Sequence, residues 1–200
     1  MRKAPWFCYI LAVLLLFGLS ACSSKAPEEA PAPEAAEAET ASAPEEQVSG
    51  EYQPGTVDGA AYENRLLGYG CYLDGWTYDE AAPAADGMRM DMSAQSDDGM
   101  YHVSVQFQQR PLAEVMETLQ EGELSESFVD AGYERVQVSL ETVTFGSESR
   151  DCVTLYAEIE GIPVAQRQVL VDCGDYTAFI TATAYLGAAP DEILMRFYPL

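Results

Sequence analysis

The fold class is indicated by one stretch of alternating apolar and polar side chains, Tyr101-His102-Val103-Ser104-Val105-Gln106-Phe107-Gln108. Alternation with a period of two is typical of a strand that buries one face. The segment Met88-Arg89-Met90-Asp91-Met92 alternates in the same way, and the turn-forming run Asp97-Asp98-Gly99 separates the two. The sequence therefore predicts a β-hairpin with one buried face, and it places the three methionines together in the core.

Two helices are expected after the hairpin. Pro111 suits the first turn of a helix, and it precedes one apolar stripe at helical spacing: Leu112, Val115, Met116 and Leu119. A second, shorter helical segment around Glu126 to Ala131 is expected to stop at Gly132, because glycine readily adopts the left-handed conformation that ends helices.

Four further strands are expected downstream, over residues 133–145, 152–159, 163–171 and 176–185. The turn signals Gly146, Glu160-Gly161 and Gly174 separate them. Links this short require neighbouring strands to run antiparallel, since a parallel pair needs a crossover of roughly a dozen residues or more.

The two ends of this region complete the predicted fold. Residues 190–197 begin with acids and carry apolar side chains on one side, which predicts a closing helix packed on the sheet. Leu66 to Leu73 is interpreted as the opening strand, with Trp76 in its exit turn. Residues 51–200 are therefore predicted to form one α+β domain, with an antiparallel sheet of about six to seven strands packed with helices.

Residues 1–21 have the pattern of a secretory signal. The basic start Met1-Arg2-Lys3 precedes the apolar run Trp6 to Phe17, which is too short to span a bilayer. Leu19-Ser20-Ala21-Cys22 then resembles a bacterial lipobox, which is cut before Cys22 and carries lipid, such as palmitate, on the cysteine sulfur. The alternatives are cleavage by an ordinary signal peptidase and an uncleaved, membrane-anchored start. The lipobox predicts an extracytoplasmic protein held on the bacterial membrane through acylated Cys22.

Residues 22–50 are expected to be a disordered tether that follows the lipidated cysteine. Alanine, proline and glutamate dominate this stretch, and Val48 is its one large apolar side chain. Such a composition buries too little apolar surface to offset the entropy lost on ordering. The tether would let the folded domain stand clear of the lipid headgroups.

The charge balance excludes one class of partner. The chain carries 33 acidic residues against 10 basic ones, for a net charge of −23. Nucleic-acid binding requires clustered positive charge to neutralise phosphates, so nucleic acid is not expected as a partner. The same sign disfavours direct docking on an anionic membrane, whereas a cationic partner would be attracted.

The ionisable residues offer little for catalysis or metal binding. His102 is the only histidine, which excludes a site with two histidine ligands, and it is expected to be exposed on its strand. Among the cysteines, Cys8 leaves with the signal and Cys22 takes lipid. A hairpin turn at Glu160-Gly161 would place Cys152 opposite Val169, too far from Cys173 for a disulfide. A disulfide from Cys71 to either of the other two is geometrically open but has no support in the sequence, so three free thiols, Cys71, Cys152 and Cys173, are expected.

Three short motifs fail as functional sites. Gly68-x-Gly70 lacks the third glycine and the following helix of a dinucleotide loop, so it is interpreted as a strand that needs close backbone approach. Asp97-Asp98-Gly99 lacks the further oxygen ligands of a calcium loop, and no serine carries the flanking glycines of a nucleophile elbow. The sequence thus predicts no catalytic residue, no cofactor site and no metal site.

The order of short signatures resembles a known family. The segment Gly68-Tyr69-Gly70 to Trp76 is followed by a hairpin, a helix that ends in Ala131-Gly132-Tyr133, a meander, and Gly174-Asp175-Tyr176 running into Ile180-Thr181. This order resembles the PsbP-like family of α/β/α sandwiches, which includes a photosystem subunit, a Ran-binding factor and envelope lipoproteins of the DcrB and LpqN type. The resemblance implies a non-enzymatic role in protein binding or assembly, and it carries over no functional residue.

Three functional hypotheses follow. The first is an anchored envelope module that binds another envelope protein, in an oligomeric state that the sequence leaves open. The second is a lipoprotein that binds a small ligand between sheet and helices, suggested by aromatic residues: Tyr69, Tyr72, Trp76, Tyr101 and Tyr133. The third is a hydrolase that works with paired carboxylates.

The lipobox makes a direct prediction about the mature protein. Mass spectrometry of the protein isolated from its bacterial membrane should find an N-terminus at Cys22 that carries acyl chains. An unacylated N-terminus, or an intact chain inside the cytoplasm, would show that the signal has been misinterpreted.

Overall fold

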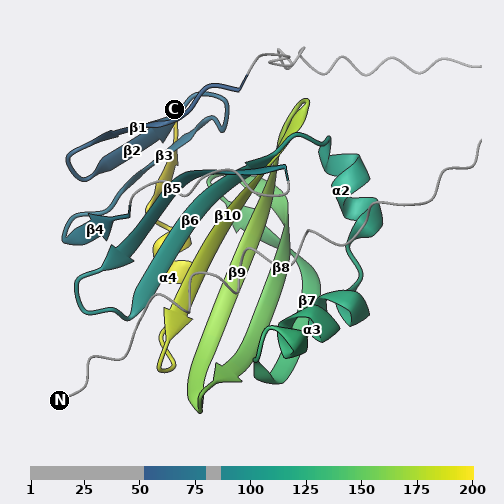
Figure 1. The fold of residues 1–200 in the computed structure, drawn as a ribbon. Helices are drawn as coiled ribbons and strands as arrows, with labels where there is room; N and C mark the ends of the chain where they lie inside the picture. The colour runs from purple at the N-terminus through teal and green to yellow at the C-terminus, as the bar shows by residue number, and fades with distance from the viewer. Residues whose placement is uncertain (1–51, 80–86) are drawn as a thin grey trace, which may run out of the picture.

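The computed structural model describes residues 52–79 and 87–200 (Figure 1). The predicted signal peptide, Cys22 and the tether therefore lie outside the described residues. Of the described residues, 56% lie in strands and 15% in helices. The predicted α+β class, an α/β/α sandwich around one helix-packed sheet, is wrong: the described part of the chain is mostly β, with two antiparallel sheets.

The larger sheet has seven strands, in the order β4-β5-β6-β10-β9-β8-β7. Their bounds are Trp76–Tyr78 (β4), Met88–Ser96 (β5), Tyr101–Gln108 (β6), Tyr176–Tyr185 (β10), Ile162–Cys173 (β9), Glu148–Ile159 (β8) and Glu134–Phe145 (β7). The smaller sheet has the order β1-β2-β3-β11. Its strands are Thr56–Asp58 (β1), Ala61–Asn64 (β2), Tyr69–Tyr72 (β3) and Phe197–Pro199 (β11).

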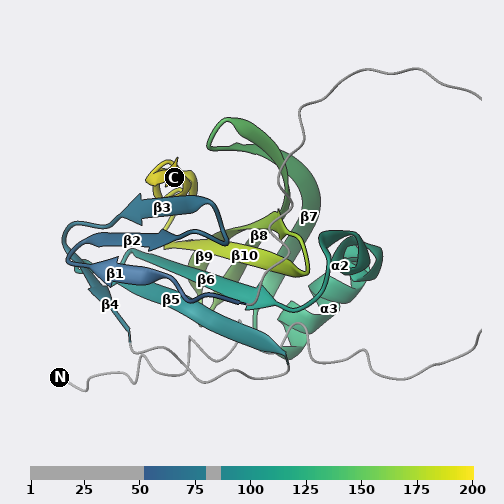
Figure 2. The same ribbon diagram turned by 90° about the horizontal axis from the view of Figure 1, so that it is seen from above.

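Three short helices belong to the described part of the chain: Leu112–Thr118 (α2), Glu121–Asp130 (α3) and Asp191–Leu194 (α4). Helices α2 and α3 stand at the β7–β8 side of the large sheet, whereas the small sheet lies over the other face (Figures 1 and 2). The predicted helix after Pro111 is confirmed. The second helix is longer than predicted, and the chain leaves it at Gly132, with a φ of +92°.

The hairpin and the meander are also confirmed. Strands β5 and β6 pair antiparallel, as do β7, β8, β9 and β10 in sequence. Residues Glu160 and Gly161 turn the chain with positive φ at both positions, which matches the right-handed twist of the flanking strands. This turn fixes the register, so that Cys152 lies opposite Val169 as the sequence predicted.

The large sheet is buried on both faces, so the prediction of one buried face is wrong. Val103, Val105 and Phe107 pack with residues of the small sheet such as Tyr62 and Cys71. On the opposite face, α2 and α3 cover two smaller apolar clusters that include Val153, Leu155, Leu170 and Phe179. Because β6 is a central strand covered on both sides, its polar side chains are buried or half-buried as well. The alternation in β6 therefore places apolar side chains on the face towards the small sheet and polar side chains on the opposite face.

A β-bulge in β5 splits the methionine stripe. Met90 lies opposite Gln106 while Met92 lies opposite Val105, so Asp91 is an extra residue without a partner in β6. Met88 consequently packs against the helices and Met92 packs against the small sheet. The three methionines do not share one face, because one inserted residue reverses the alternation of side chains.

The small sheet was not predicted. Its strands have three or four residues, too few for a period-two pattern. The predicted opening strand Leu66 to Leu73 is a turn followed by β3, and the predicted closing helix ends at Leu194, after which β11 pairs with β3. The interpretation of Gly68-x-Gly70 as a close-approach strand holds for Gly70, where an added Cβ would lie 2.9 Å from the Tyr198 ring. It is wrong for Gly68, which lies in a turn with a φ of +74° and open space around it.

The carboxylate of Asp91 joins the two sheets. It accepts hydrogen bonds from the hydroxyls of Tyr52 and Tyr62, each at 2.5 Å, from the amide of Asn64 at 2.9 Å and from the main-chain N–H of Gly55 at 3.0 Å. Burial, together with the Asp91 charge, raises the pKa of Tyr62, so this hydroxyl stays a proton donor. The bulge thus turns a polar residue of the large sheet into the acceptor that holds the small one.

Replacing this carboxylate should destabilise the fold. Asp91→Ala leaves the fully buried Tyr62 hydroxyl without its acceptor and the buried Asn64 amide with the Gln53 carbonyl at 3.3 Å, which should lower the free energy of unfolding by about 3 kcal/mol. Denaturant unfolding of the full-length protein measures this loss. Asp58→Ala, which removes an exposed carboxylate from β1, is the matched control and should change the free energy by less than about 0.5 kcal/mol.

Candidate functional site

The described residues hold no prearranged metal site. Within 52–79 and 87–200, no group of three or more His, Cys, Asp or Glu side chains lies close enough to hold a metal ion. Over the same residues, no helix is long and apolar enough to cross a membrane. A functional site is therefore sought in four other features: the surroundings of His102, the thiols, one cavity and the edge of the large sheet.

His102 belongs to a short polar chain. Its Nε2 lies 3.0 Å from the Ser93 hydroxyl, and that hydroxyl donates to the Asp79 carboxylate at 2.7 Å. Burial lowers the pKa of His102, while the Asp79 charge acts in the opposite direction. The expectation of an exposed histidine is wrong, since the ring is half-buried in the strand pair β5–β6.

This chain is in the wrong order for nucleophilic catalysis. A catalytic histidine accepts the proton of the serine hydroxyl, and a carboxylate orients the histidine. Here the only hydroxyl proton of Ser93 goes to Asp79, so the hydroxyl accepts from the Nε2–H of His102. The arrangement orients polar side chains and does not activate Ser93.

Uncharged polar side chains accompany His102 on the helix-facing side of the large sheet. Nine of them are buried: Ser93, Ser104, Gln106, Gln108, Gln166, Gln168, Thr177, Thr181 and Thr183. Gln168 donates to the Thr181 hydroxyl at 3.1 Å. Sequence reasoning predicted exposure for the polar residues of β6, because alternation alone does not reveal that the strand is central.

The three thiols are free and buried, as predicted. Burial raises the pKa of Cys71 and of Cys173 to about 12 and also raises that of Cys152. A thiol that stays protonated is a poor nucleophile and a poor metal ligand. These cysteines contribute to the cores as small apolar side chains.

The five aromatic residues that suggested a ligand cleft do not form one cluster. Tyr69 stacks near Phe145, Tyr133 packs edge to face on Phe128, and Trp76 stacks with Tyr101. None of the five predicted rings lines the cavity described next. The structure brings Trp76 and Tyr101 together and leaves the other three apart from this pair, because they come from the small sheet or from the opposite edge of the large sheet.

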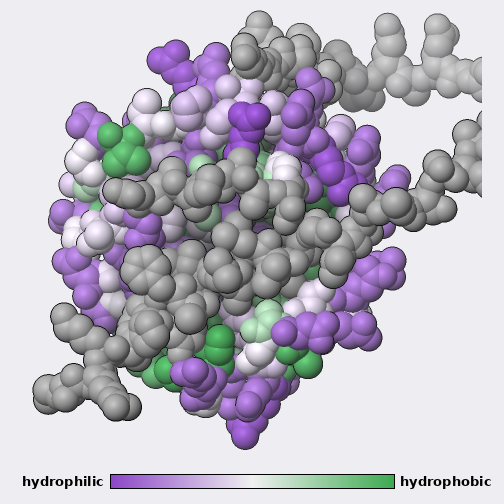
Figure 3. Space-filling model, viewed as in Figure 1, coloured by the Kyte–Doolittle hydropathy of each residue, from purple (hydrophilic) through white to green (hydrophobic). Residues whose placement is uncertain are grey.

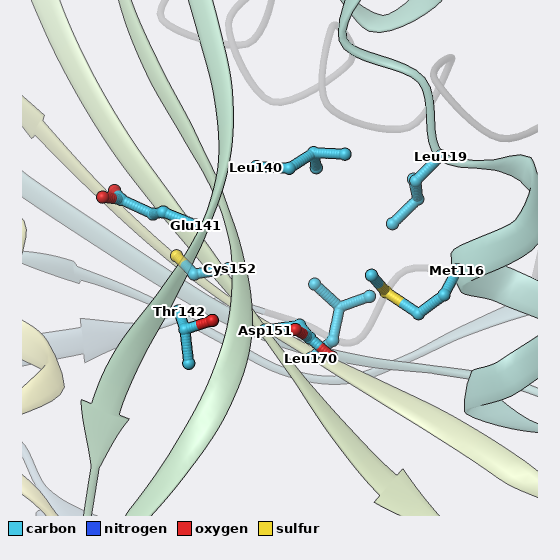
Figure 4. Close-up of a pocket in the computed structure, with 8 residues that line it drawn as sticks. All are labelled: Met116, Leu119, Leu140, Glu141, Thr142, Asp151, Cys152 and Leu170. Carbon is cyan, nitrogen blue, oxygen red and sulfur yellow. The ribbon is translucent and has the colours of Figure 1, made fainter.

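One cavity of about 110 Å³ lies between α2 and the β7 side of the large sheet (Figure 4). Met116 lines it from α2, Leu119 from the position directly after α2, and Leu140 and Thr142 from β7. The remaining lining residues are Glu141, Asp151, Cys152 and Leu170. Sites for small organic ligands have volumes of roughly 300–1,000 Å³. The cavity is large enough for one side chain and too small for such a ligand.

The two carboxylates of this cavity are not a catalytic pair. Glu141 lies opposite Cys152 and Asp151 lies opposite Thr142, so their side chains belong to opposite faces of the sheet. Figure 4 shows Glu141 directed away from Met116 and Leu119. The Glu141 carboxylate contacts the Arg167 guanidinium at 3.2 Å instead. A hydrolase that works with paired acids therefore finds no support here.

Strand β7 is the long free edge of the large sheet. It has 12 residues, whereas β4 at the opposite edge has three. The views of Figures 1 and 2 agree that β8 lies on one side of β7. Along β7, side chains from Glu134 to Thr144 are exposed or half-buried. Sequence reasoning predicted this strand but not its place at the edge, because strand order depends on contacts far apart in the chain.

The main chain of β7 carries outward-directed polar groups. The N–H of Leu140 donates to the Glu121 carboxylate at 2.8 Å and therefore points away from β8. In an antiparallel pair, alternate residues direct both main-chain groups to the same side. Val138, Thr142 and Thr144 are in phase with Leu140, so their N–H and C=O groups also face the open edge.

The surface charge beside this edge is negative. Residues 121–145, which form α3 and β7, contain six carboxylates and one arginine. That arginine, Arg135, is paired with Glu158 at 2.6 Å. Figure 3 shows that hydrophilic residues predominate among the coloured residues of the visible face. An approaching cationic group would meet an unneutralised acidic surface here.

Comparisons with known proteins show loose similarity alone. No protein-family model and no curated protein matches the chain. A crystal structure from Bacteroides thetaiotaomicron is 12% identical over 72% of the chain, with a TM-score of 0.43, and the chain spans 49% of its length. LpqN, involved in cell envelope biogenesis of Mycobacterium tuberculosis, is 13% identical over 62% of the chain and 89% of its own, with a TM-score of 0.31. The resemblance to the PsbP-like family stays a hypothesis.

The burial of His102 makes a pH prediction. Because its pKa in the folded state is below the ordinary value near 6.5, the unfolded chain binds a proton first as the pH falls. The contribution of neutral His102 to the free energy of unfolding should be complete above about pH 7 and should decrease as the pH falls below the ordinary histidine value near 6.5. Denaturant unfolding of the wild-type protein and His102→Gln measures the difference, since the carboxylates titrate alike in both. Equal slopes over this interval would contradict the predicted shift.

Proposed function

We propose that this chain is a lipid-anchored extracytoplasmic module that binds another protein of the cell envelope and catalyses no reaction. The observation that carries the proposal is the open edge of β7. An unpaired strand presents a row of N–H and C=O groups on which a segment of another chain can form a further strand. With twelve residues this edge is longer than the average strand, and Glu121 contacts one of its outward N–H groups, that of Leu140.

The composition of β7 supports pairing. Proteins protect free edges with lysine, proline, bulges or very short strands. Between residues 136 and 145 there is no lysine or proline, and Glu141 is the one charged residue. The irregularity in register is confined to the start of the strand, between Glu134 and Gln137. The rest of β7, rich in valine and threonine, has high β propensity and is left open.

The N-terminal pattern supports the location. Acylation at Cys22 would hold the chain on the membrane, and the tether would let the domain reach beyond the headgroups. Because the chain carries a net charge of −23, an anionic membrane surface would repel the domain. An acidic domain on a tether is thus kept away from the lipid and free to meet a neighbouring protein.

A proline at the edge tests this proposal. Thr142→Pro removes an N–H that points outward and leaves the β7–β8 hydrogen bonds in place, so the fold should persist while strand addition fails. Thr142→Val is the matched control, because it removes the hydroxyl and keeps the N–H. Crosslinking in intact cells, followed by affinity capture of the full-length lipoprotein, should give the same partner with wild type and Thr142→Val and at least tenfold less with Thr142→Pro.

Circular dichroism and thermal unfolding establish that each variant is folded. Recovery of the partner with folded Thr142→Pro at the wild-type level would refute binding at this edge. Repeated capture of no protein with the wild-type chain would refute the binding function itself.

A further inference from the structure

We propose that the β7 edge takes an extended basic segment of its partner as an eighth strand, and that a lysine or arginine side chain of this segment enters the cavity beside Leu140, with its cation at Asp151. This inference rests on the proposed function and specifies its chemistry. Three features of the described residues carry it: the direction of the main-chain groups, the lining of the cavity, and the local charge.

The main chain of β7 sets where the incoming side chains lie. The outward-facing residues Val138, Leu140 and Thr142 have side chains on the face covered by the helices, because they alternate with Glu141, which is on the opposite face. A residue that pairs with Leu140 or Thr142 places its own side chain on the same face. That side chain is directed to the cavity, which Leu140 and Thr142 line.

The cavity suits a long aliphatic stem with a polar end. Met116, Leu119, Leu140 and Leu170 form an apolar wall (Figure 4). Lysine and arginine bury their methylene groups along such surfaces and keep their charge at a polar rim. The Asp151 carboxylate supplies that rim. A volume of about 110 Å³ accommodates one side chain, as expected for a pocket that recognises a single residue of an added strand.

The charges around the edge favour an incoming side chain with a positive charge. Asp151 lines the cavity and belongs to none of the described salt bridges, whereas Glu141 pairs with Arg167 and Glu158 with Arg135. Glu121 occupies the Leu140 N–H and would be displaced by an incoming carbonyl, leaving its carboxylate beside the bound segment. A cationic side chain would thus meet Asp151 at its tip and Glu121 nearby. An acidic segment would meet repulsion at both positions.

Copies of the chain itself fit this edge less well. Edge-to-edge pairing of two copies would bring together two chains that each carry a charge of −23. It would also place the acidic α3 helices of both copies beside the same seam. A basic partner removes this repulsion, and for that reason the occupant is a cationic segment of a different protein.

Peptide binding to the full-length protein in detergent micelles tests the inference. The probes are three capped, fluorescent peptides, GSVTVXVTSG, in which X is lysine, glutamate or norleucine. Fluorescence anisotropy should show the lysine peptide binding at least tenfold more tightly than the glutamate peptide, with norleucine between them. The preference for lysine should decrease as salt is added, since the contact with Asp151 is electrostatic.

Two variants separate the cation contact from strand pairing. Asp151→Asn, which keeps the shape of the side chain, should weaken the lysine peptide about five- to tenfold and leave the norleucine peptide within twofold. Asp58→Asn makes the same charge change on β1 and should alter none of the three affinities. Thr142→Pro should weaken all three peptides, because each needs the main-chain edge.

Several outcomes would overturn the inference. Equal affinity for the lysine and glutamate peptides would do so, as would a lysine preference that survives Asp151→Asn. Binding that persists in Thr142→Pro would exclude strand addition, and a dimer that this variant abolishes in sedimentation would identify a second copy as the occupant. If the crosslinked partner still depends on the Thr142 N–H while the peptides show no charge preference, the proposed function stands and this inference fails.

Discussion

The architecture depends on the carboxylate of Asp91. It lies in a bulge of the large sheet and accepts four donors that come from the small sheet and the segment leading into it. Two of these donors, Tyr62 and Asn64, are almost fully buried, so each would be costly without an acceptor. The contact therefore orients the small sheet as well as attaching it, because four donors converging on one carboxylate define a single docking position.

Docking of the small sheet makes the large sheet asymmetric. At one edge, β4 has three residues, and two of them, Trp76 and Tyr78, pack against the core that the two sheets share. At the other edge, β7 extends 12 residues, and among the described residues the Glu121 side chain reaches over its main chain. One edge is thus short and close to packed elements, while the opposite edge is long and open. The candidate binding surface follows from this asymmetry more than from any single side chain.

The sequence predicted the elements that depend on local signals. The strands from Glu134 to Tyr185, the helix after Pro111 and the turn at Glu160 all follow from alternation, helical spacing and turn residues. The bulge at Asp91 could not be predicted, because a polar residue between two methionines fits regular alternation equally well. The small sheet was missed for a related reason: β3 pairs with β11 across more than 120 residues of chain, and Asp91 binds Tyr62 and Asn64 of β2. The cavity depends on how α2 packs over Leu140 and Leu170, which no spacing in the sequence encodes.

The acidic composition and the open edge make sense together. A long free strand rich in valine and threonine invites pairing with any other strand, including the same strand of another copy. Where other proteins place lysine or proline on the edge itself, this chain keeps the edge uncharged between residues 136 and 140 and surrounds it with carboxylates from α3 and β8. Copies of the chain then repel one another when their charges are closer than the screening length of the salt solution. A basic segment experiences the opposite force and, once near, finds unpaired main-chain groups to bond. The charge that prevents self-association is therefore the same charge that would select the partner.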